Sequence, residues 1–279
     1  NDNAFSMASF PHDQKQHSAF HHSFHGRTTS AVPAPDNQTI VAPLNAQHQV
    51  DFVALGDLAA VAAILEQEET CAVIVECIQG VGGLDENSSE FYQGVAKLCA
   101  QYGALFIADE VQSGYGRTGD FFAFQKHNLV PDIISVAKGM GNGFPIGGIL
   151  IHPRIEASYG LLGTTFGGNH LACSAALSVL EVIEKQELMK NASHISEYFV
   201  KRSAQLSEVK KVKGRGLMLG LEFDFPVAAL RKKLIETHHI FTGSSNNPNL
   251  LRILPPLTMQ KKHIDVFFEA LTKELKNNL

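Results

Sequence analysis

LFIADEV, residues 105–111, and IISVA, residues 133–137, are the two stretches that decide the fold. Both are short and rich in Ile, Val or Leu, and their apolar residues follow one another, as in strands that are buried on both faces. Val73–Gln79 and Ile146–Ile151 have the same character, and Ser88–Tyr102 carries apolar residues at helical spacing. Repetition of strand, helix and strand predicts an α/β fold with a mostly parallel central sheet flanked by helices.

The C-terminal part of the chain has a different pattern. A long helix is predicted over His170–Gln186. Further helices are predicted at Ala192–Leu206, Val227–His238 and Lys261–Leu275, and strands at Leu217–Phe223 and Leu251–Leu254. We predict a large α/β domain over residues 1–170, and a linking helix with a small α+β domain over residues 171–279. Because the chain begins inside a predicted helix, Asn3–Phe10, we expect that an N-terminal part is missing.

The composition excludes several classes of function. The 279 residues carry 23 Lys and Arg against 28 Asp and Glu, a net charge of −5, whereas nucleic-acid binding needs a basic surface. No apolar run approaches the roughly 18 residues of a membrane-spanning helix, and no basic-apolar leader is present. The four cysteines lack C-x-x-C spacing, which indicates free thiols in a reducing compartment. We expect a cytoplasmic protein without nucleic-acid or membrane partners.

Charged residues lie at the ends of the predicted strands. Glu76 is near the end of the first strand, Asp109 and Glu110 lie at the end of the second, and Lys138 lies just past the third. The carboxyl ends of parallel strands meet at one edge of the sheet, where ligands bind. The glycine-rich run 139–143 lets other groups approach Lys138, and a lysine beside apolar walls becomes a usable nucleophile or base. Taken singly, however, Lys138 is more typical of a solvated surface lysine, and Asp109 of a turn cap.

Four further motifs have simpler interpretations. The glycines within 139–143 lack the full G-x-G-x-x-G spacing of a dinucleotide site. Thr165, just before the long helix, offers a hydroxyl and neighbouring amides to a phosphate, with a capped loop as the alternative. The histidines at 17, 21, 22 and 25 match no zinc spacing, so we expect no metal. We interpret Arg117, which lies in a tight loop, as structural, with anion binding as the alternative.

Six stretches together resemble one known family. They are SFHGRT at 23–28, ECIQGVGG at 76–83, LFIADEVQSGYGRTG at 105–119, PDIISVAKGMGNGFPIGGILI at 131–151, GTTFGGNHLA at 163–172 and RILPPL at 252–257. The chain resembles the class III, fold type I pyridoxal-phosphate aminotransferases through essentially its whole length, and among them the acetylornithine and succinylornithine aminotransferases. The resemblance implies the fold type I architecture, pyridoxal 5'-phosphate as cofactor, and a homodimer.

The resemblance also implies roles on the cofactor side. Lys138 resembles the lysine that forms a Schiff base with the cofactor. Asp109 resembles the aspartate that keeps the pyridine nitrogen protonated, so that the ring withdraws electrons. Thr165 resembles the threonine that binds the phosphate of the neighbouring subunit's cofactor. The other implied cofactor-binding residues are the ring-packing Phe24, Gln112 at the phenolic oxygen, and Glu110 and Val111 next to Asp109.

On the substrate side the resemblance implies two carboxylate-binding arginines. Arg27 resembles the arginine that binds the substrate carboxylate, and Arg252 the arginine that binds the α-carboxylate of glutamate or 2-oxoglutarate. Arginine suits both places because its guanidinium pairs with a carboxylate through two parallel hydrogen bonds. Thr164 matches a substrate-contacting serine position, and Glu76 is counted with the substrate-binding residues.

Three departures from the family pattern stand out. The family's phosphate loop, a Ser-Gly-Ala/Thr-Glu-Ala run, is expected immediately before Asn1 and is absent from the sequence, so these residues alone would bind cofactor poorly. Relatives that act on free ornithine usually carry a glutamate at the position of Val81, where it screens the second arginine. Valine leaves Arg252 available and suits a bulkier N-acylated substrate. Cys77 replaces the usual proline after Glu76, which we interpret as structurally tolerable.

The resemblance implies transfer of the δ-amino group of N-acetylornithine or N-succinylornithine to 2-oxoglutarate, in arginine biosynthesis. Three alternatives stay open. One is another class III ω-aminotransferase, acting on ornithine or 4-aminobutyrate. An aminomutase, which needs no external keto acid, is the second. The third is a cofactor-free α/β binding protein.

Overall fold

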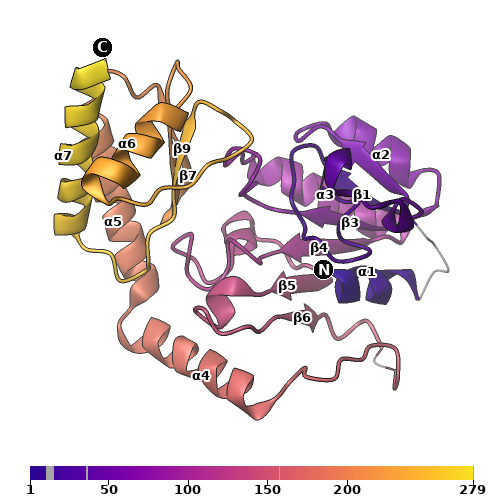
Figure 1. Cartoon of the computed structure of the whole chain (residues 1–279). Helices are drawn as coiled ribbons and strands as arrows, with labels where there is room; N and C mark the ends of the chain where they lie inside the picture. The colour runs from indigo at the N-terminus through magenta and orange to yellow at the C-terminus, as the bar shows by residue number, and fades with distance from the viewer. Residues whose placement is uncertain (11–15, 36, 157, 279) are drawn as a thin grey trace.

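A computed structural model describes residues 1–10, 16–35, 37–156 and 158–278. The larger part of the molecule is built on a six-stranded sheet in the order β2-β1-β3-β4-β5-β6 (Figure 1). In chain order its strands are β1 (Gln16–Phe20), β2 (Val50–Val53), β3 (Thr70–Val75), β4 (Leu105–Asp109), β5 (Ile133–Val136) and β6 (Gly148–Ile151). The first five strands run parallel, and β6 pairs antiparallel with β5 at the edge. The predicted α/β fold with a mostly parallel sheet is confirmed.

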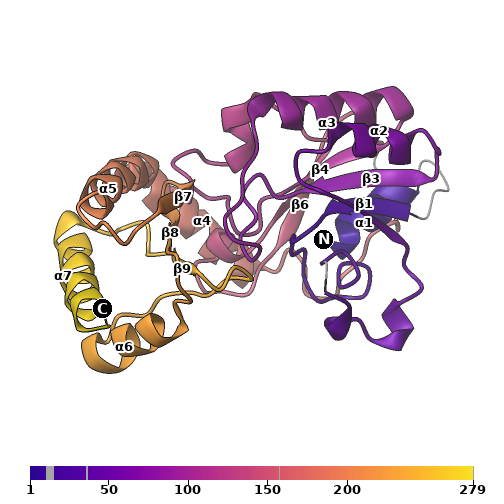
Figure 2. The same ribbon diagram turned by 90° about the horizontal axis from the view of Figure 1, so that it is seen from above.

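Helices cover both faces of the sheet, because successive side chains of a strand point to opposite sides. Val73 belongs to the core beneath α2 (Leu58–Leu65) and α3 (Ser89–Tyr102), whereas Ile74 belongs to the core beneath α1 (Asp2–Ser9). Figure 2 shows α2 and α3 above the sheet and α1 on the opposite face. Burial on both faces explains why the strands are continuous apolar runs rather than alternating ones.

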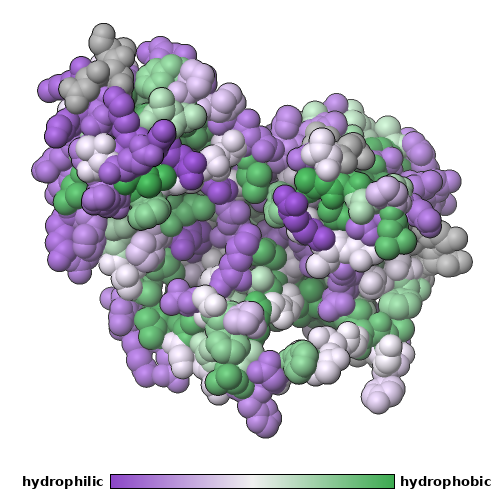
Figure 3. All heavy atoms as spheres, in the orientation of Figure 1, coloured by the Kyte–Doolittle hydropathy of each residue, from purple (hydrophilic) through white to green (hydrophobic). Residues whose placement is uncertain are grey.

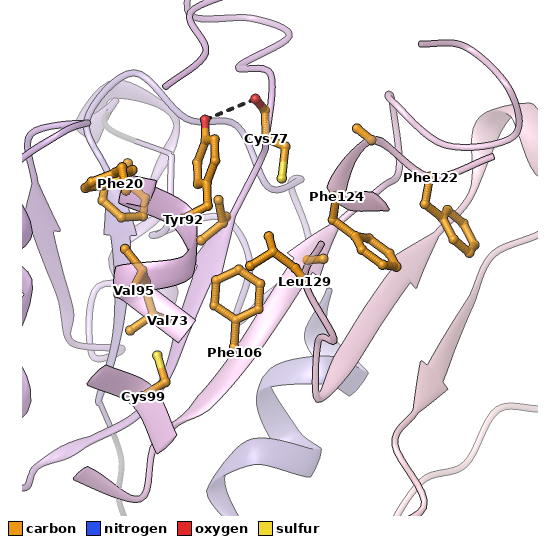
Figure 4. Packing of buried hydrophobic residues seen from close by; sticks show 14 of the residues in the cluster. Phe20, Val73, Cys77, Tyr92, Val95, Cys99, Phe106, Phe122, Phe124 and Leu129 are labelled. Carbon is orange, nitrogen blue, oxygen red and sulfur yellow. Dashed lines mark hydrogen bonds between the residues drawn. The ribbon is translucent and has the colours of Figure 1, made fainter. Parts of the chain in front are cut away.

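The core beneath α3 is seen at close range in Figure 4. Phe106 of β4 lies against α3, and the fully buried Tyr92 satisfies its hydroxyl by donating to the Cys77 carbonyl at 3.0 Å. α3 begins after Ser88, whose hydroxyl accepts from a backbone amide of the first turn, and ends at Gly103 with a φ of 77°. Glycine adopts this left-handed conformation without the steric cost that a Cβ brings.

The C-terminal part has its own sheet and core. Its helices are α4 (His170–Lys185), α5 (Leu188–Ser203), α6 (Ala228–His238) and α7 (Lys261–Asn278), and its antiparallel sheet has the order β7 (Lys211–Arg215), β8 (Met218–Glu222) and β9 (Leu250–Ile253). Apolar residues of α5, α6 and α7 pack against this sheet. In Figure 1, α4 runs along the lower edge of the molecule toward α5 and this second body. The division at residues 170 and 171 stays a prediction.

Several elements differ from the sequence prediction. β1, β2, β7 and α2 were not predicted, and the short 3-10 helices η1 (Gln38–Ile40), η2 (Pro43–Asn45), η3 (Ala123–His127) and η4 (Lys138–Met140) were not predicted either. The strand predicted over 73–79 lies at Thr70–Val75, because the chain turns away from the sheet at Glu76. Across the described residues, no helix is both long enough and apolar enough to cross a membrane.

Two arginines connect the two parts. Arg117 donates through Nη1 to the backbone carbonyls of Leu217, at 3.3 Å, and of Pro255. Arg215 pairs with Asp120 at 3.0 Å and donates to a backbone carbonyl of η3 at 2.7 Å. Burial lowers the pKa of Arg117 below its ordinary value. Both hydrogen bonds of the Arg117 guanidinium go to the protein's own backbone, as the structural interpretation of Arg117 expects.

Candidate active site

Four neighbouring strands end at the same edge of the sheet. In spatial order β1 leads into the segment that carries Phe24 and His25, β3 into Glu76, β4 ends at Asp109, and β5 leads to Lys138. Because these strands are parallel and adjacent, residues far apart in sequence come together here. The predicted gathering of acids and a lysine at one strand edge is what the structure has.

Asp109 lies at the centre of this edge and is buried. Its Oδ2 accepts from His25 Nδ1 at 2.7 Å and from the Asn1 side-chain amide at 2.8 Å. Its Oδ1 accepts from the Val111 amide at 3.1 Å and from the Ser135 hydroxyl at 3.3 Å. Asp109 is therefore more than a turn cap, since donors from three other segments converge on its carboxylate.

The environment of Asp109 favours the charged carboxylate. Burial by itself raises the pKa of this group, but the hydrogen bond and positive charge of His25, with the donors Val111 and Asn1, hold the pKa below its ordinary value of 3.8. A permanently charged carboxylate is thus kept in an almost water-free position, where its charge acts strongly on whatever binds beside it.

Lys138 follows β5 and opens η4 with a φ of 46°. A non-glycine residue in the left-handed region costs roughly 1–3 kcal/mol, and such residues cluster at functional sites. Its side chain is exposed and, within the described ranges, its Nζ has no hydrogen-bond or ion-pair partner. Lys138 lines a cavity of about 460 Å³ together with Gln112, Tyr115 and Asn142. The amine is open to a bound molecule.

Gln112 and Arg252 meet over the loop that follows Glu76. Arg252 donates through Nη1 to the Gly80 carbonyl at 2.5 Å and to Gln112 Oε1 at 3.4 Å. The Gln112 amide lies against Gly80 so closely that a Cβ on Gly80 would come 2.5 Å from Gln112 Cδ. Burial lowers the pKa of Arg252 from its ordinary value, although the nearby Glu76 carboxylate opposes the shift. The predicted cofactor-side Gln112 and substrate-side Arg252 are thus direct neighbours.

The carboxylates of two predicted site residues, Glu76 and Glu110, accept hydrogen bonds from backbone amides. Glu76 is buried and accepts from the amides of Phe24 and Gly80. Glu110 is also buried and accepts from the amides of Ala123 and Phe124, at 3.0 and 2.9 Å, at the C-terminal end of the loop 113–124. Burial raises the pKa of each to about 7, against the effect of these hydrogen bonds. The substrate contact of Glu76 and the cofactor contact of Glu110 stay predictions, since these carboxylates serve the fold.

Arg27, Thr164 and Thr165 form no side-chain hydrogen bond or ion pair with any residue that the structure describes. All three are exposed. The helix after Thr165 begins at His170, as predicted, and is capped by Asn169, whose side chain accepts from the Ala172 amide at 2.9 Å. Thr165 lies four residues before that cap, outside the first turn, so a phosphate at Thr165 would not be bound by the helix amides of its own chain.

The histidines expected not to bind metal have separate partners. His17 is buried in β1 and stacks on Phe5 with ring centroids 4.0 Å apart, whereas His25 belongs to Asp109. In the described part of the chain no group of three His, Cys, Asp or Glu side chains could hold a metal ion. Sequence reasoning missed His25 as the partner of Asp109. The signal was its place beside Phe24 in SFHGRT, a stretch already singled out.

Comparison with known sequences identifies the family. Residues 1–275 match the model of the family Aminotransferase class-III. The acetylornithine aminotransferase of Aquifex aeolicus is 41% identical over 267 residues, which cover 92% of this chain and 68% of the relative. The chain belongs to the class III aminotransferases. The acetylornithine aminotransferase of Bacillus subtilis is 37% identical, with 91% of this chain and 66% of the relative covered. This class III chain spans about two thirds of the length of these relatives.

Solved structures agree with the family. The ornithine δ-aminotransferase of Plasmodium falciparum has a TM-score of 0.80 and 27% identity, over all of this chain and 71% of that one. The ornithine aminotransferase of Toxoplasma gondii has a TM-score of 0.86 at 23% identity, over 99% of this chain and 70% of that one, and this likeness shows the fold alone. The likeness to these solved structures therefore supports the fold type I architecture independently of the sequence.

Class III aminotransferases depend on pyridoxal phosphate, and the sheet edge fits that cofactor. A charged, buried carboxylate at Asp109 is what a protonated ring nitrogen requires. The bonds to Asp109 Oδ1, at 3.1 and 3.3 Å, are longer than those to Oδ2, which leaves Oδ1 the less engaged oxygen. Lys138 offers an unpaired amine from the adjacent strand end. The charged Asp109 carboxylate and the free Lys138 amine therefore suit pyridoxal phosphate.

Proposed function

We propose that this chain carries out the pyridoxal-phosphate-dependent transfer of the δ-amino group of N-acetylornithine, or of N-succinylornithine, to 2-oxoglutarate. The products are the N-acyl-glutamate semialdehyde and glutamate, and the reaction belongs to arginine biosynthesis. The observation that carries the proposal is the placement of Asp109 and Lys138 at adjacent strand ends, with the charge of Asp109 sustained by His25. The relatives at 41% and 37% identity named acetylornithine aminotransferase support the substrate.

Each of the two residues has a defined task in this reaction. The cofactor, when bound, supplies an electron-withdrawing ring that stabilises negative charge developing on the substrate carbon. Asp109 keeps the ring nitrogen protonated by remaining charged itself. Lys138 Nζ, unpaired among the described residues, takes a proton from the substrate carbon and returns it as general base and acid.

Carboxylate recognition supports an N-acylated donor over free ornithine. Arg252 is held by a backbone carbonyl and by the neutral amide of Gln112, and no carboxylate among the described residues forms an ion pair with it. Val81 supplies no charge to screen Arg252. A 2-oxoglutarate carboxylate would therefore meet a guanidinium that these neutral acceptors hold in place and that no carboxylate already occupies, and such a charge-assisted pairing is favourable. Arg27 and Thr164 are proposed to contact the donor.

We also propose a homodimer in which Thr165 serves the neighbouring subunit's cofactor. Support comes from apolar side chains that a single chain leaves uncovered: Phe166 is 80% exposed, Leu171 68% and Leu177 61%. Hydrophobic residues reach the surface along the lower part of the molecule in Figure 3, where Figure 1 has α4 and β6. Several large apolar side chains exposed on one side of the molecule favour an interaction surface there. The four unpaired cysteines favour a cytoplasmic location.

Steady-state assays of the full-length protein test the proposal. N-acetylornithine, N-succinylornithine, ornithine and 4-aminobutyrate are compared as donors with 2-oxoglutarate. We expect turnover with an N-acylornithine, loss of turnover when 2-oxoglutarate is omitted, and a visible absorbance band that disappears on borohydride reduction. Lys138→Ala should abolish both band and turnover. Retained turnover in Lys138→Ala would sink the assignment. Preference for ornithine would favour the ornithine type, and the absence of any band would favour a cofactor-free binding protein.

A further inference from the structure

Glu76 is a buried carboxylate that joins two segments of the site. It lies directly after β3 and is 6% exposed. Its Oε1 accepts from the Phe24 amide at 2.8 Å, a contact across 52 residues of sequence. Its Oε2 accepts from the Gly80 amide at 2.9 Å, four residues along the same turn. One side chain therefore fixes the backbone of two segments that share no strand.

The two segments carry different parts of the proposed site. Phe24 lies next to His25, which sustains the charge of Asp109. Gly80 presents its carbonyl to Arg252 at 2.5 Å, and its missing side chain leaves the space that the Gln112 amide fills. A displacement of either segment would move the cofactor side and the carboxylate-binding side relative to each other. The Glu76 carboxylate is the group that opposes such a displacement.

The charged groups near Glu76 are few and are themselves part of the site. They are His25 and Asp109, from the β1 and β4 ends, and Arg252 from β9. A carboxylate buried among these groups needs hydrogen-bond donors for both oxygens, because leaving a buried acceptor without a partner costs free energy of folding. Both of its oxygens are satisfied by backbone amides, so Glu76 has a positioning geometry rather than that of a group reaching for substrate.

We propose that Glu76 is a positioning residue that holds the Phe24 segment and the Gly80–Arg252 contact in one arrangement, so that cofactor binding and recognition of the second carboxylate substrate depend on the same buried side chain. The proposal rests on the proposed function. It gives Glu76 a role through its neighbours, in place of the direct substrate contact that the family resemblance implies. Its specific consequence is that 2-oxoglutarate, the ligand of Arg252, should be affected through Glu76.

Glu76→Gln and Glu76→Ala in the full-length holoenzyme test the proposal. Glutamine keeps the shape but turns one acceptor into a donor that faces an amide. The loss of one hydrogen bond of about 1.4 kcal/mol corresponds to a tenfold change, so we expect about a tenfold rise in the KM for 2-oxoglutarate. The cofactor dissociation constant, followed by absorbance titration without substrate, should rise as well. Asp132→Asn is the matched control, because Asp132 is also buried and accepts the Phe106 amide at 2.9 Å, at the opposite end of the strands.

A merely structural role would lower thermal stability in the Glu76 and Asp132 variants alike and leave both constants unchanged. That result overturns the proposal. A second arm uses Arg252→Lys: if Glu76 acts through Arg252, the effect of Glu76→Gln on the KM for 2-oxoglutarate should shrink in that background, whereas full additivity would contradict the coupling. Glu76→Gln carries the test if Glu76→Ala does not fold. Failure of the wild-type enzyme to transaminate would instead refute the proposed function.

Discussion

His25 Nδ1 lies 2.7 Å from Asp109 Oδ2, and both side chains are almost completely buried. The two residues are separated by 84 positions and reach each other because β1 and β4 both flank β3. The pair keeps a charge where desolvation would otherwise remove it. For a reaction that needs a permanently charged partner beside a ring nitrogen, this pairing decides whether Asp109 can perform its task.

Removing His25 should leave that charge without its partner. We expect His25→Ala to lower the free energy of unfolding by roughly 3 kcal/mol, because an uncompensated buried charge is strongly destabilising. The double variant His25→Ala/Asp109→Asn should recover part of the loss, since no charge then remains, and urea unfolding measures both single variants, His25→Ala and Asp109→Asn, and the double variant. Because the folded pKa of Asp109 lies below its ordinary 3.8, its contribution is present above about pH 4 and is lost as the pH falls through the folded value. Strict additivity of the two substitutions would contradict the pairing.

Gly80 should be required for the site more than for the fold. An alanine Cβ there would lie 2.5 Å from Gln112 Cδ, so the flexible amide must move and give up its contact with Arg252. We expect Gly80→Ala to raise the KM for 2-oxoglutarate roughly fivefold, equal to one hydrogen bond of about 1 kcal/mol, with a small change in melting temperature. Gly148→Ala is the control, since its nearest contact is an ordinary 3.8 Å to Val136. Equal kinetics for the two variants would refute the role of Gly80.

His17 should make the protein less stable in mild acid. Burial, together with the positive charges of His25 and His48, lowers its pKa from 6.5 to about 3. Between these values the unfolded chain binds the proton and the folded chain does not, so stability is lost as the pH falls through this window. From pH 7 to pH 5 the wild type should lose about 2 kcal/mol more than His17→Gln, measured by urea unfolding at each pH. The exposed His194→Gln should follow the wild type. Parallel pH profiles for His17→Gln and the wild type would show that His17 is not the cause.

Gly216 should be essential where the two parts of the molecule meet. Its φ is 57°, and a Cβ would lie 2.6 Å from Thr118 Cα, a backbone atom that cannot step aside. The adjacent Leu217 amide donates to the Arg117 carbonyl at 2.8 Å, so the strain would open this junction. We expect Gly216→Ala to cost roughly 2–3 kcal/mol in chemical denaturation. Gly103→Ala, at a φ of 77° with no atom within 4 Å, should cost only about 1 kcal/mol. Similar losses in both variants would show that conformation, and not the junction, dominates.

Local sequence was sufficient for the central strands and for two of the site residues. β3, β4 and β5 are buried on both faces, which makes their apolar runs continuous and readable. Asp109 and Lys138 stand at the ends of such runs, where a charged residue is conspicuous. β1 was missed because it carries the polar residues His17 and Ser18 in a buried strand, and β7 was missed because its residues, KVKGR, are mostly polar or charged.

The sequence by itself therefore determined the family, the parallel sheet and the placement of Asp109 and Lys138 at adjacent strand ends, because local runs and motifs express these features directly. Which other residues contact the site residues was decided only by the tertiary structure. His25 serves Asp109, Glu76 holds Phe24 and Gly80, and Arg252 reaches Gly80 across 172 residues. Such contacts depend on the order of the strands in the sheet. That order is set by the packing of distant segments, so no spacing along the chain encodes it.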